Sequence, residues 1–154
     1  MSKSKRKKKC KNEQSDGLLF LKSVDEDKNI CVRDLESFAN VDFPLFSFRW
    51  LSSYSIEKCN DPKFFLSYLM RLQKLSELGW KEIRLSDRHS FGMEKIPVDA
   101  VKPKKLPEIV TPDVEKLDVF RATGNNLPMV GLQEGKIFHV FFIEASFGDV
   151  YSHD

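Results

Sequence analysis

Residues 118–143 read DVFRATGNNLPMVGLQEGKIFHVFFI, in which three apolar runs are separated by two turn sequences. The turns span Thr123 to Asn126 and Gln133 to Gly135, and both are rich in residue types that reverse the chain. Short runs of β-branched and aromatic residues between such turns are typical of strands. The stretch therefore predicts an antiparallel three-strand meander, followed by a short polar C-terminal tail.

Two segments upstream carry further patterns. Residues 43–51 are rich in aromatic residues that partly alternate with polar ones, which predicts a strand with Phe46, Phe48 and Trp50 on one face. Asp61-Pro62 is a typical helix start, because aspartate caps free N–H groups and proline fits the first turn.

A helix is expected from Asp61-Pro62 to Gly79, which is a typical stop residue. Apolar residues at steps of three and four predict the face that packs on the core, with Arg71 and Lys74 facing out. That predicted face holds Phe65, Leu69, Met70, Leu72 and Leu75. Residues 80–85 fit either a strand or a second helix.

The chain of 154 residues is expected to form one α+β domain, with a small antiparallel sheet whose C-terminal three-strand meander packs against one or two helices. Residues 1–16 are predicted to be a disordered basic tail and residues 17–154 the domain. Within it, residues 17–41 form an N-terminal extension, either a strand pair or a strand and a short helix. Residues 97–112, with four prolines, form an extended surface connection.

Charge is unevenly distributed along the chain. The first eleven residues hold seven basic residues and no acid, which leaves 18 basic against 23 acidic residues in the rest. Such a basic run either attracts polyanions without reading sequence or only aids solubility. The acidic remainder argues against a broad nucleic-acid-binding face, so any such contact is expected to be local or to depend on the tail.

The three cysteines are widely spaced and form no metal-binding pattern, as expected for free thiols in a reducing cytoplasm. Neither a membrane-spanning apolar run nor a signal-peptide core is present, so we expect a cytoplasmic protein with no membrane partner. Phosphate-binding glycine loops, zinc-protease motifs and clustered carboxylates are also missing. The sequence therefore predicts no cofactor and no metal.

Several residues carry side chains suited to phosphate binding and proton transfer. Arg121, on the first meander strand, offers a guanidinium that binds phosphate through two hydrogen bonds, although a surface arginine would look the same. Arg88 and His89 lie in a polar connection and are candidate substrate-binding residues, with an ordinary surface as the alternative.

Three further candidates lie in or after the last strand. His139 sits among apolar residues and is either a buried core histidine or a proton-transfer group. Tyr151 and His153 are two residues apart, so an extended tail would place both side chains on one side. They either supply a phenol and an imidazole to a shallow site or form a frayed end.

The order of strand, one or two helices and a meander with a terminal Tyr/His resembles the RelE/ParE toxin superfamily over residues 43–154. This resemblance implies a bacterial toxin–antitoxin protein that cleaves messenger RNA on the ribosome without a metal. It assigns phosphate binding to Arg121 and proton transfer to Tyr151 and His153, whereas His139 has no firm counterpart. The longer proline-rich stretch and the acidic body depart from these basic toxins.

The implied reaction is attack of a ribose 2′-hydroxyl on the adjacent phosphorus. RNA or the ribosome and an antitoxin protein are then the expected partners, whereas the sequence does not indicate an oligomeric state. The alternative hypothesis is a non-catalytic module on a similar scaffold that binds protein or nucleic acid, of the kind that a phage or mobile element encodes.

Overall fold

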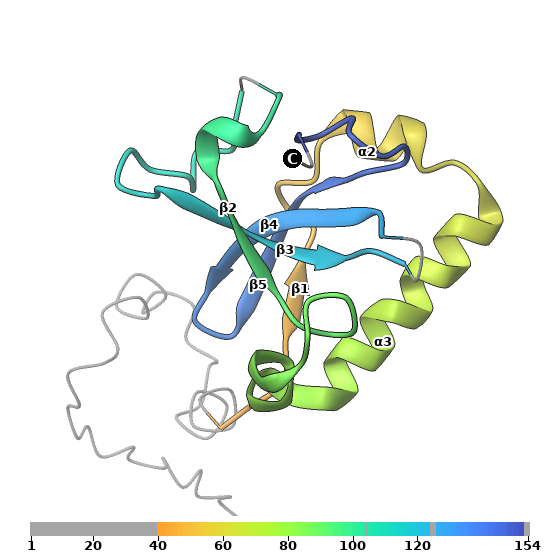
Figure 1. Ribbon diagram of the computed structural model, residues 1–154, viewed down its shortest axis with the longest axis vertical. Coiled ribbons are helices and arrows are strands. Elements are labelled where there is room, and N and C mark those ends of the chain that lie inside the picture. The colour runs from red at the N-terminus through yellow and green to blue at the C-terminus, as the bar shows by residue number, and fades with distance from the viewer. Residues whose placement is uncertain (1–39, 104, 124–125, 153–154) are drawn as a thin grey trace, which may run out of the picture. The chain divides into compact units, whose positions relative to one another are not determined.

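The three apolar runs of residues 118–143 form adjacent strands of a five-strand sheet. The computed structural model describes residues 40–152 except 104 and 124–125, so the expectations for residues 1–16 and nearly all of 17–41 lie outside it. β3 (Lys116–Arg121), β4 (Pro128–Glu134) and β5 (Ile137–Ile143) pair antiparallel in sequence order (Figure 1). The α+β class and the meander are thereby confirmed.

Two short strands complete the sheet, in the order β1-β5-β4-β3-β2. β2 (Glu94–Pro97) pairs antiparallel with β3, and no strand was expected there. β1 (Leu45–Ser47) runs parallel to β5, so the sheet is mixed rather than purely antiparallel.

The strand predicted over residues 43–51 is only three residues long. The expectation that Phe46, Phe48 and Trp50 share a face is wrong, because the chain leaves the sheet after Ser47. Phe46 and Trp50 pack against different hydrophobic clusters, and Phe48 is 43% exposed.

Two helices connect β1 to β2, namely α2 (Ser53–Lys58) and α3 (Pro62–Leu85). Asp61 caps α3 as predicted, since its carboxylate accepts hydrogen bonds from Lys63 N at 3.3 Å and Phe64 N at 3.2 Å. Gly79, with φ of +82°, interrupts the helical backbone. Residues 80–85 then resume as a second helical segment, so the alternative of a strand is wrong.

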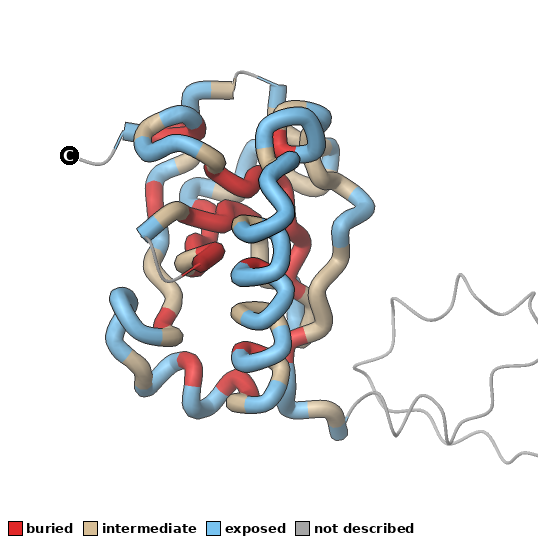
Figure 2. Tube along the Cα trace, turned by 90° about the vertical axis from the view of Figure 1, so that its right-hand side faces the viewer, coloured by how far each residue is buried: buried red, intermediate tan, exposed pale blue. Residues whose placement is uncertain are grey.

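The predicted buried face of α3 is only partly correct. Leu72 and Leu75 do pack toward the sheet, and Tyr68 is buried beside them. Phe65, Leu69 and Met70 instead point outward and are 57%, 53% and 59% exposed. Figure 2 shows this outward side of α3 in pale blue, with buried strands behind it.

The core has two parts, one on each face of the sheet. Side chains of α3, including Tyr68 and Leu75, cover one face against Phe120 and Phe138. The other face is covered by residues of the proline-rich segment and the C-terminal tail. That segment begins with a 3-10 turn, η2 (Val98–Ala100), and its apolar residues pack on the sheet rather than remaining at the surface. In the described part of the chain, no helix has the length and apolarity needed to cross a membrane.

A close approach between β4 and β5 makes Gly131 a sensitive position. The pairing register shifts between Val130 and Gly131, and a Cβ atom on Gly131 would overlap the His139 carbonyl oxygen. The same Cβ would lie 2.8 Å from a ring carbon of Phe138, which is fully buried. The two central strands therefore cannot pair in this way around a larger residue.

We expect Gly131→Ala to lower the free energy of unfolding by about 3 kcal/mol, the upper end for overpacking. Gly135→Ala is the matched control, because Gly135 has φ of +58° but open space around it, and only the backbone cost of about 1 kcal/mol applies. Urea unfolding followed by circular dichroism measures both values. Equal losses in the two variants would contradict the close approach.

Candidate functional site

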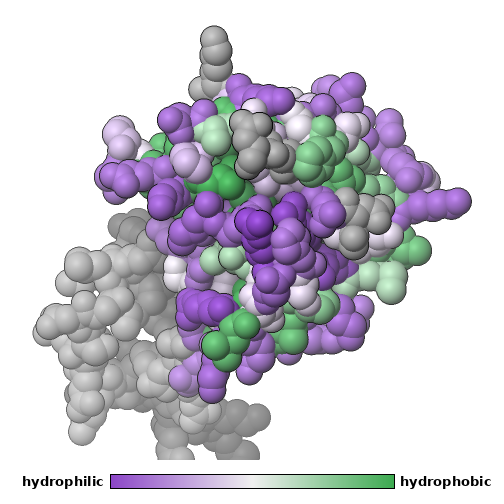
Figure 3. All heavy atoms as spheres, viewed as in Figure 1, coloured by the Kyte–Doolittle hydropathy of each residue, from purple (hydrophilic) through white to green (hydrophobic). Residues whose placement is uncertain are grey.

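A pocket of about 440 Å³ opens where β2, the end of β3 and the C-terminal tail meet. In Figure 3, hydrophilic side chains gather across the centre of this face. The charged and polar lining residues are Arg88, His89, Glu94, Lys95, Arg121, Asn126, Tyr151 and Ser152. Ile96, Pro97, Ala100 and Phe147 supply the apolar lining.

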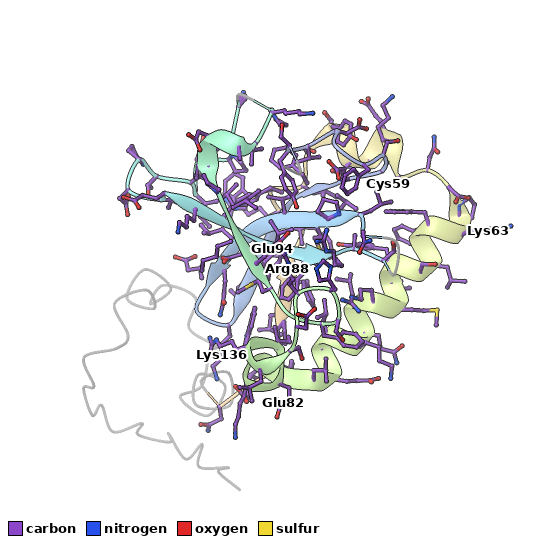
Figure 4. The ribbon with its side chains drawn as sticks, in the orientation of Figure 1. Cys59, Lys63, Glu82, Arg88, Glu94 and Lys136 are labelled. Atoms are coloured by element: carbon purple, nitrogen blue, oxygen red, sulfur yellow. The ribbon has the colours of Figure 1, made fainter. Side chains whose placement is uncertain are left out.

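The carboxylate of Glu94 is the common partner of three of these side chains. Arg88 Nη1 lies 3.2 Å from Glu94 Oε2, and Figure 4 shows these two residues together in front of the sheet. Tyr151 Oη donates a hydrogen bond to Glu94 Oε1 at 3.1 Å, and Arg121 Nη2 lies 3.7 Å from the same oxygen. One carboxylate thus engages two guanidinium groups and a phenol.

Arg121 is fixed at both its side chain and its backbone. Its side chain is only 11% exposed, and Nη1 donates to the carbonyl oxygen of Asn126 at 2.9 Å. Its own carbonyl oxygen accepts a hydrogen bond from Arg71 Nε at 3.2 Å. Arg71 therefore faces the sheet, whereas the periodicity of α3 predicted that it would face out.

Arg71 also holds the loop that carries Arg88 and His89. Its guanidinium lies 4.1 Å from the ring centroid of Phe91 and donates to the carbonyl oxygen of Ser90. Burial lowers the pKa of this guanidinium from its ordinary value. Because the ordinary pKa of arginine lies far above 7, Arg71 keeps its charge at neutral pH. One side chain of α3 thus contacts both the backbone of Arg121 and the loop that carries Arg88.

Within the loop, Asp87 organises the turn before β2. Its side chain accepts a hydrogen bond from His89 N at 2.7 Å, and its carbonyl oxygen accepts from Ser90 N and Gly92 N, both at 2.9 Å. Arg88 Nε donates to His89 Nε2 at 3.2 Å. The imidazole and the guanidinium are therefore neighbours at the mouth of the pocket.

The C-terminal tail reaches the pocket because one buried carboxylate and two hydrogen bonds nearer the surface hold it in place. Glu144 is fully buried and accepts a hydrogen bond from Val150 N at 2.7 Å. Tyr54 Oη on α2 donates to Asp149 Oδ2 at 2.5 Å, and Lys102 N donates to Val150 O at 2.8 Å. Tyr151 follows at once and is only 4% exposed.

Tyr151 is held in its neutral form. Burial is the largest cause that raises the pKa of its phenol far above the ordinary value, and the neighbouring Glu94 carboxylate raises it further, while Arg121 opposes them. At neutral pH Tyr151 is therefore a hydrogen-bond donor and not a base.

The structure brings together four of the six residues singled out from the sequence, namely Arg88, His89, Arg121 and Tyr151. His153 lies outside the described residues, so its position stays a prediction. His139 does not line the pocket. It is buried in β5, paired with Leu132 and Ser47 on the neighbouring strands, as the alternative of a core histidine predicts.

Among the described residues, neither ring nitrogen of His139 makes a hydrogen bond. Its Nε2 lies 3.5 Å from Glu134 Oε2, but without the alignment that a hydrogen bond needs. This contact is on the far side of β4 from Arg121, and we assign His139 no part in the pocket.

The main residue that sequence reasoning missed is Glu94. The order Met93-Glu94-Lys95-Ile96-Pro97 alternates apolar and charged residues only weakly, so β2 was not recognised. The available signals for a short edge strand were Gly92 just before it and Pro97, which is its last residue. Lys95 follows Glu94 along β2, and its Nζ lies 2.5 Å from Asp118 Oδ1. Asp118 is buried, and its Oδ2 also accepts a hydrogen bond from Gln133 N at 2.8 Å.

In the part of the chain that the structure describes, no group of three or more His, Cys, Asp or Glu residues is arranged to hold a metal ion. The comparisons with known proteins found no matching family model, no matching curated protein and no matching solved structure.

All three tyrosines of the chain have a phenol pKa raised by burial above its ordinary value near 10. Their neutral forms stabilise the fold below that pH, and the stabilisation is lost as the pH rises through the folded-state values. We expect absorbance at 295 nm to show no phenolate near pH 10 and to rise only as the protein unfolds at higher pH. A tyrosine that titrates near pH 10 in folded protein would contradict this arrangement.

Proposed function

We propose that the pocket binds a phosphodiester of RNA and cleaves it without a metal. The observation that carries the proposal is the Glu94 carboxylate held by Arg88, Arg121 and Tyr151. Two guanidinium groups and a phenol are also the donors that suit phosphate oxygens. A bound phosphate would compete for the same donors and displace the carboxylate.

Displacement gives Glu94 a chemical role. Once the arginines bind the phosphate, the carboxylate is left beside the substrate as an acceptor for the 2′-hydroxyl proton. The 2′-oxygen then forms a bond to phosphorus while the bond from phosphorus to the 5′-oxygen breaks. The products are a 2′,3′-cyclic phosphate and a 5′-hydroxyl, and the 5′-oxygen takes its proton from the solvent at the open side of the pocket.

Arg121 and Arg88 stabilise the negative charge that develops on the phosphoryl oxygens in this step. Arg121 suits this role because its side chain is 11% exposed and fixed by Asn126, so little reorganisation is needed. Tyr151 keeps its proton and donates a hydrogen bond. The reaction requires the 2′-hydroxyl, so RNA and not DNA is the substrate.

The biological setting that this activity favours is a bacterial RelE/ParE-like toxin that acts in the cytoplasm on ribosome-bound messenger RNA and is inhibited by an antitoxin protein. Support comes from the order of elements, with β1, two helices and the β3–β5 meander, and from the pocket beside the end of β3, the first strand of that meander. His153 stays a candidate proton donor of this site on the strength of the resemblance.

The second candidate is a non-catalytic module that binds RNA or another phosphate-containing partner. The position of Glu94 favours it, because the carboxylate neutralises the arginines when the site is empty and a ligand must replace an existing ion pair. In this case binding would occur without cleavage.

The test of cleavage uses end-labelled single-stranded RNA in excess EDTA, with and without ribosomes. We expect the wild-type protein to release fragments that end in 2′,3′-cyclic phosphate, and Arg121→Ala to be slower by about 100-fold or more. Arg84→Ala is the matched control, since Arg84 is exposed on α3. The nuclease proposal fails if the wild-type protein cuts no RNA in either condition, or if Arg121→Ala cuts as fast as Arg84→Ala.

Glu94→Gln separates the two candidates in the same assay. A nuclease should keep RNA binding in this variant and lose cleavage by about 10²- to 10⁴-fold, because the amide cannot accept the proton. If neither the wild-type protein nor Glu94→Gln cuts RNA, while both bind it and Arg121→Ala does not, the binding module is the correct function.

A further inference from the structure

Phe147 is an aromatic side chain that remains exposed at the rim of the pocket. Its residue is 63% exposed, although it lines the same pocket as Arg121 and Tyr151. By contrast, Phe120, Phe138 and Phe141 are fully buried in the core. Phe43, Phe48 and Phe65 are exposed as well, but none of them lines the pocket, so among the exposed phenylalanines of the described residues it is Phe147 that a ligand in the pocket would contact.

The loop that carries Phe147 is anchored on both sides. Before it, Glu144 N donates to Pro128 O at 2.9 Å, and the fully buried Glu144 side chain accepts from Val150 N after it. Inside the loop, Asp149 N donates to Ser146 O at 3.1 Å. The backbone on both sides of the ring is thus fixed at the pocket, and binding costs little ordering of this loop.

The pocket combines cationic and aromatic groups within the volume of a small-ligand site. Its volume of about 440 Å³ falls in the range typical of such sites. A guanidinium pair suits the phosphate of one nucleotide, and an exposed ring suits the flat face of its base.

We infer that Phe147 is a stacking platform for an unpaired base, and that the pocket therefore takes single-stranded RNA. This inference rests on the proposed function, because it names the substrate class of the same site. A base inside a duplex is stacked on both faces by its neighbours and cannot reach the ring without leaving the helix. A flipped or unpaired base meets no such cost and gains the stacking contact.

The test measures fluorescence anisotropy of labelled 2′-O-methyl RNA, which cannot undergo attack by the 2′-oxygen. Three probes of equal length are compared, namely a single strand, the same strand in a duplex and an abasic ribose-phosphate strand. We expect Phe147→Ala to bind the single strand about 10-fold more weakly and to bind the abasic strand unchanged, because only the stacking contact is lost. Phe147→Trp should bind the single strand at least as tightly as the wild-type protein.

Phe65→Ala is the matched control, since Phe65 is 57% exposed on α3 and does not line the pocket. It should bind all three probes like the wild-type protein. The stacking inference is overturned if Phe147→Ala binds the single strand with wild-type affinity. It is also overturned if the affinity of Phe147→Ala for the abasic strand falls as much as its affinity for the single strand.

The two proposals fail in different ways. If cleavage depends on Arg121, and Phe147→Ala changes neither cleavage nor binding, the stacking inference is wrong and the nuclease proposal stands. If Phe147→Ala weakens binding only of strands that contain bases, and no variant cleaves RNA, the nuclease proposal is wrong and the stacking inference stands.

Discussion

The ion pairs of Glu94 with Arg88 and Arg121 are the interaction on which the pocket depends. They join the loop after α3, the edge strand β2 and the end of β3, and Tyr151 adds the C-terminal tail through the same carboxylate. Two guanidinium groups in one partly enclosed pocket repel each other unless an anion lies between them. Glu94 is that anion in the free protein, and the proposal for RNA follows because a phosphate can replace it.

The fold was predictable where local patterns agree with one another. The meander combines apolar runs with two turns. Asp61 and Pro62 mark the start of a helix and Gly79 its break, through the local chemistry of each residue. The buried face of α3 was not predictable in the same way, because apolar residues surround much of this helix. Phe65, Leu69 and Met70 fit helical spacing as well as Tyr68 and Leu72 do, and only packing on the sheet selects between the two sets.

Several residues of the candidate site could be predicted from their types, but Glu94, the residue that the others contact, could not. Arg121 stood out as an arginine on a strand of the meander, and Tyr151 stood out as a tyrosine that follows the last strand of the meander. Tyr151 reaches the pocket through contacts that no local pattern reveals, above all Glu144 with Val150 and Tyr54 with Asp149. Glu94 was missed because one charge on a four-residue edge strand resembles any surface charge. His139 attracted attention by its type, yet its place in β5 is explained by the core.

The most direct test of the exchange between Glu94 and phosphate follows the Nε–H signals of arginine side chains by NMR in ¹⁵N-labelled protein. Single-stranded 2′-O-methyl RNA is added in steps. The account predicts that the signals of Arg88 and Arg121 move together and saturate with the binding curve, while the signal of Arg84, exposed on α3, stays in place. Binding of the RNA that leaves Arg88 and Arg121 unmoved would contradict it.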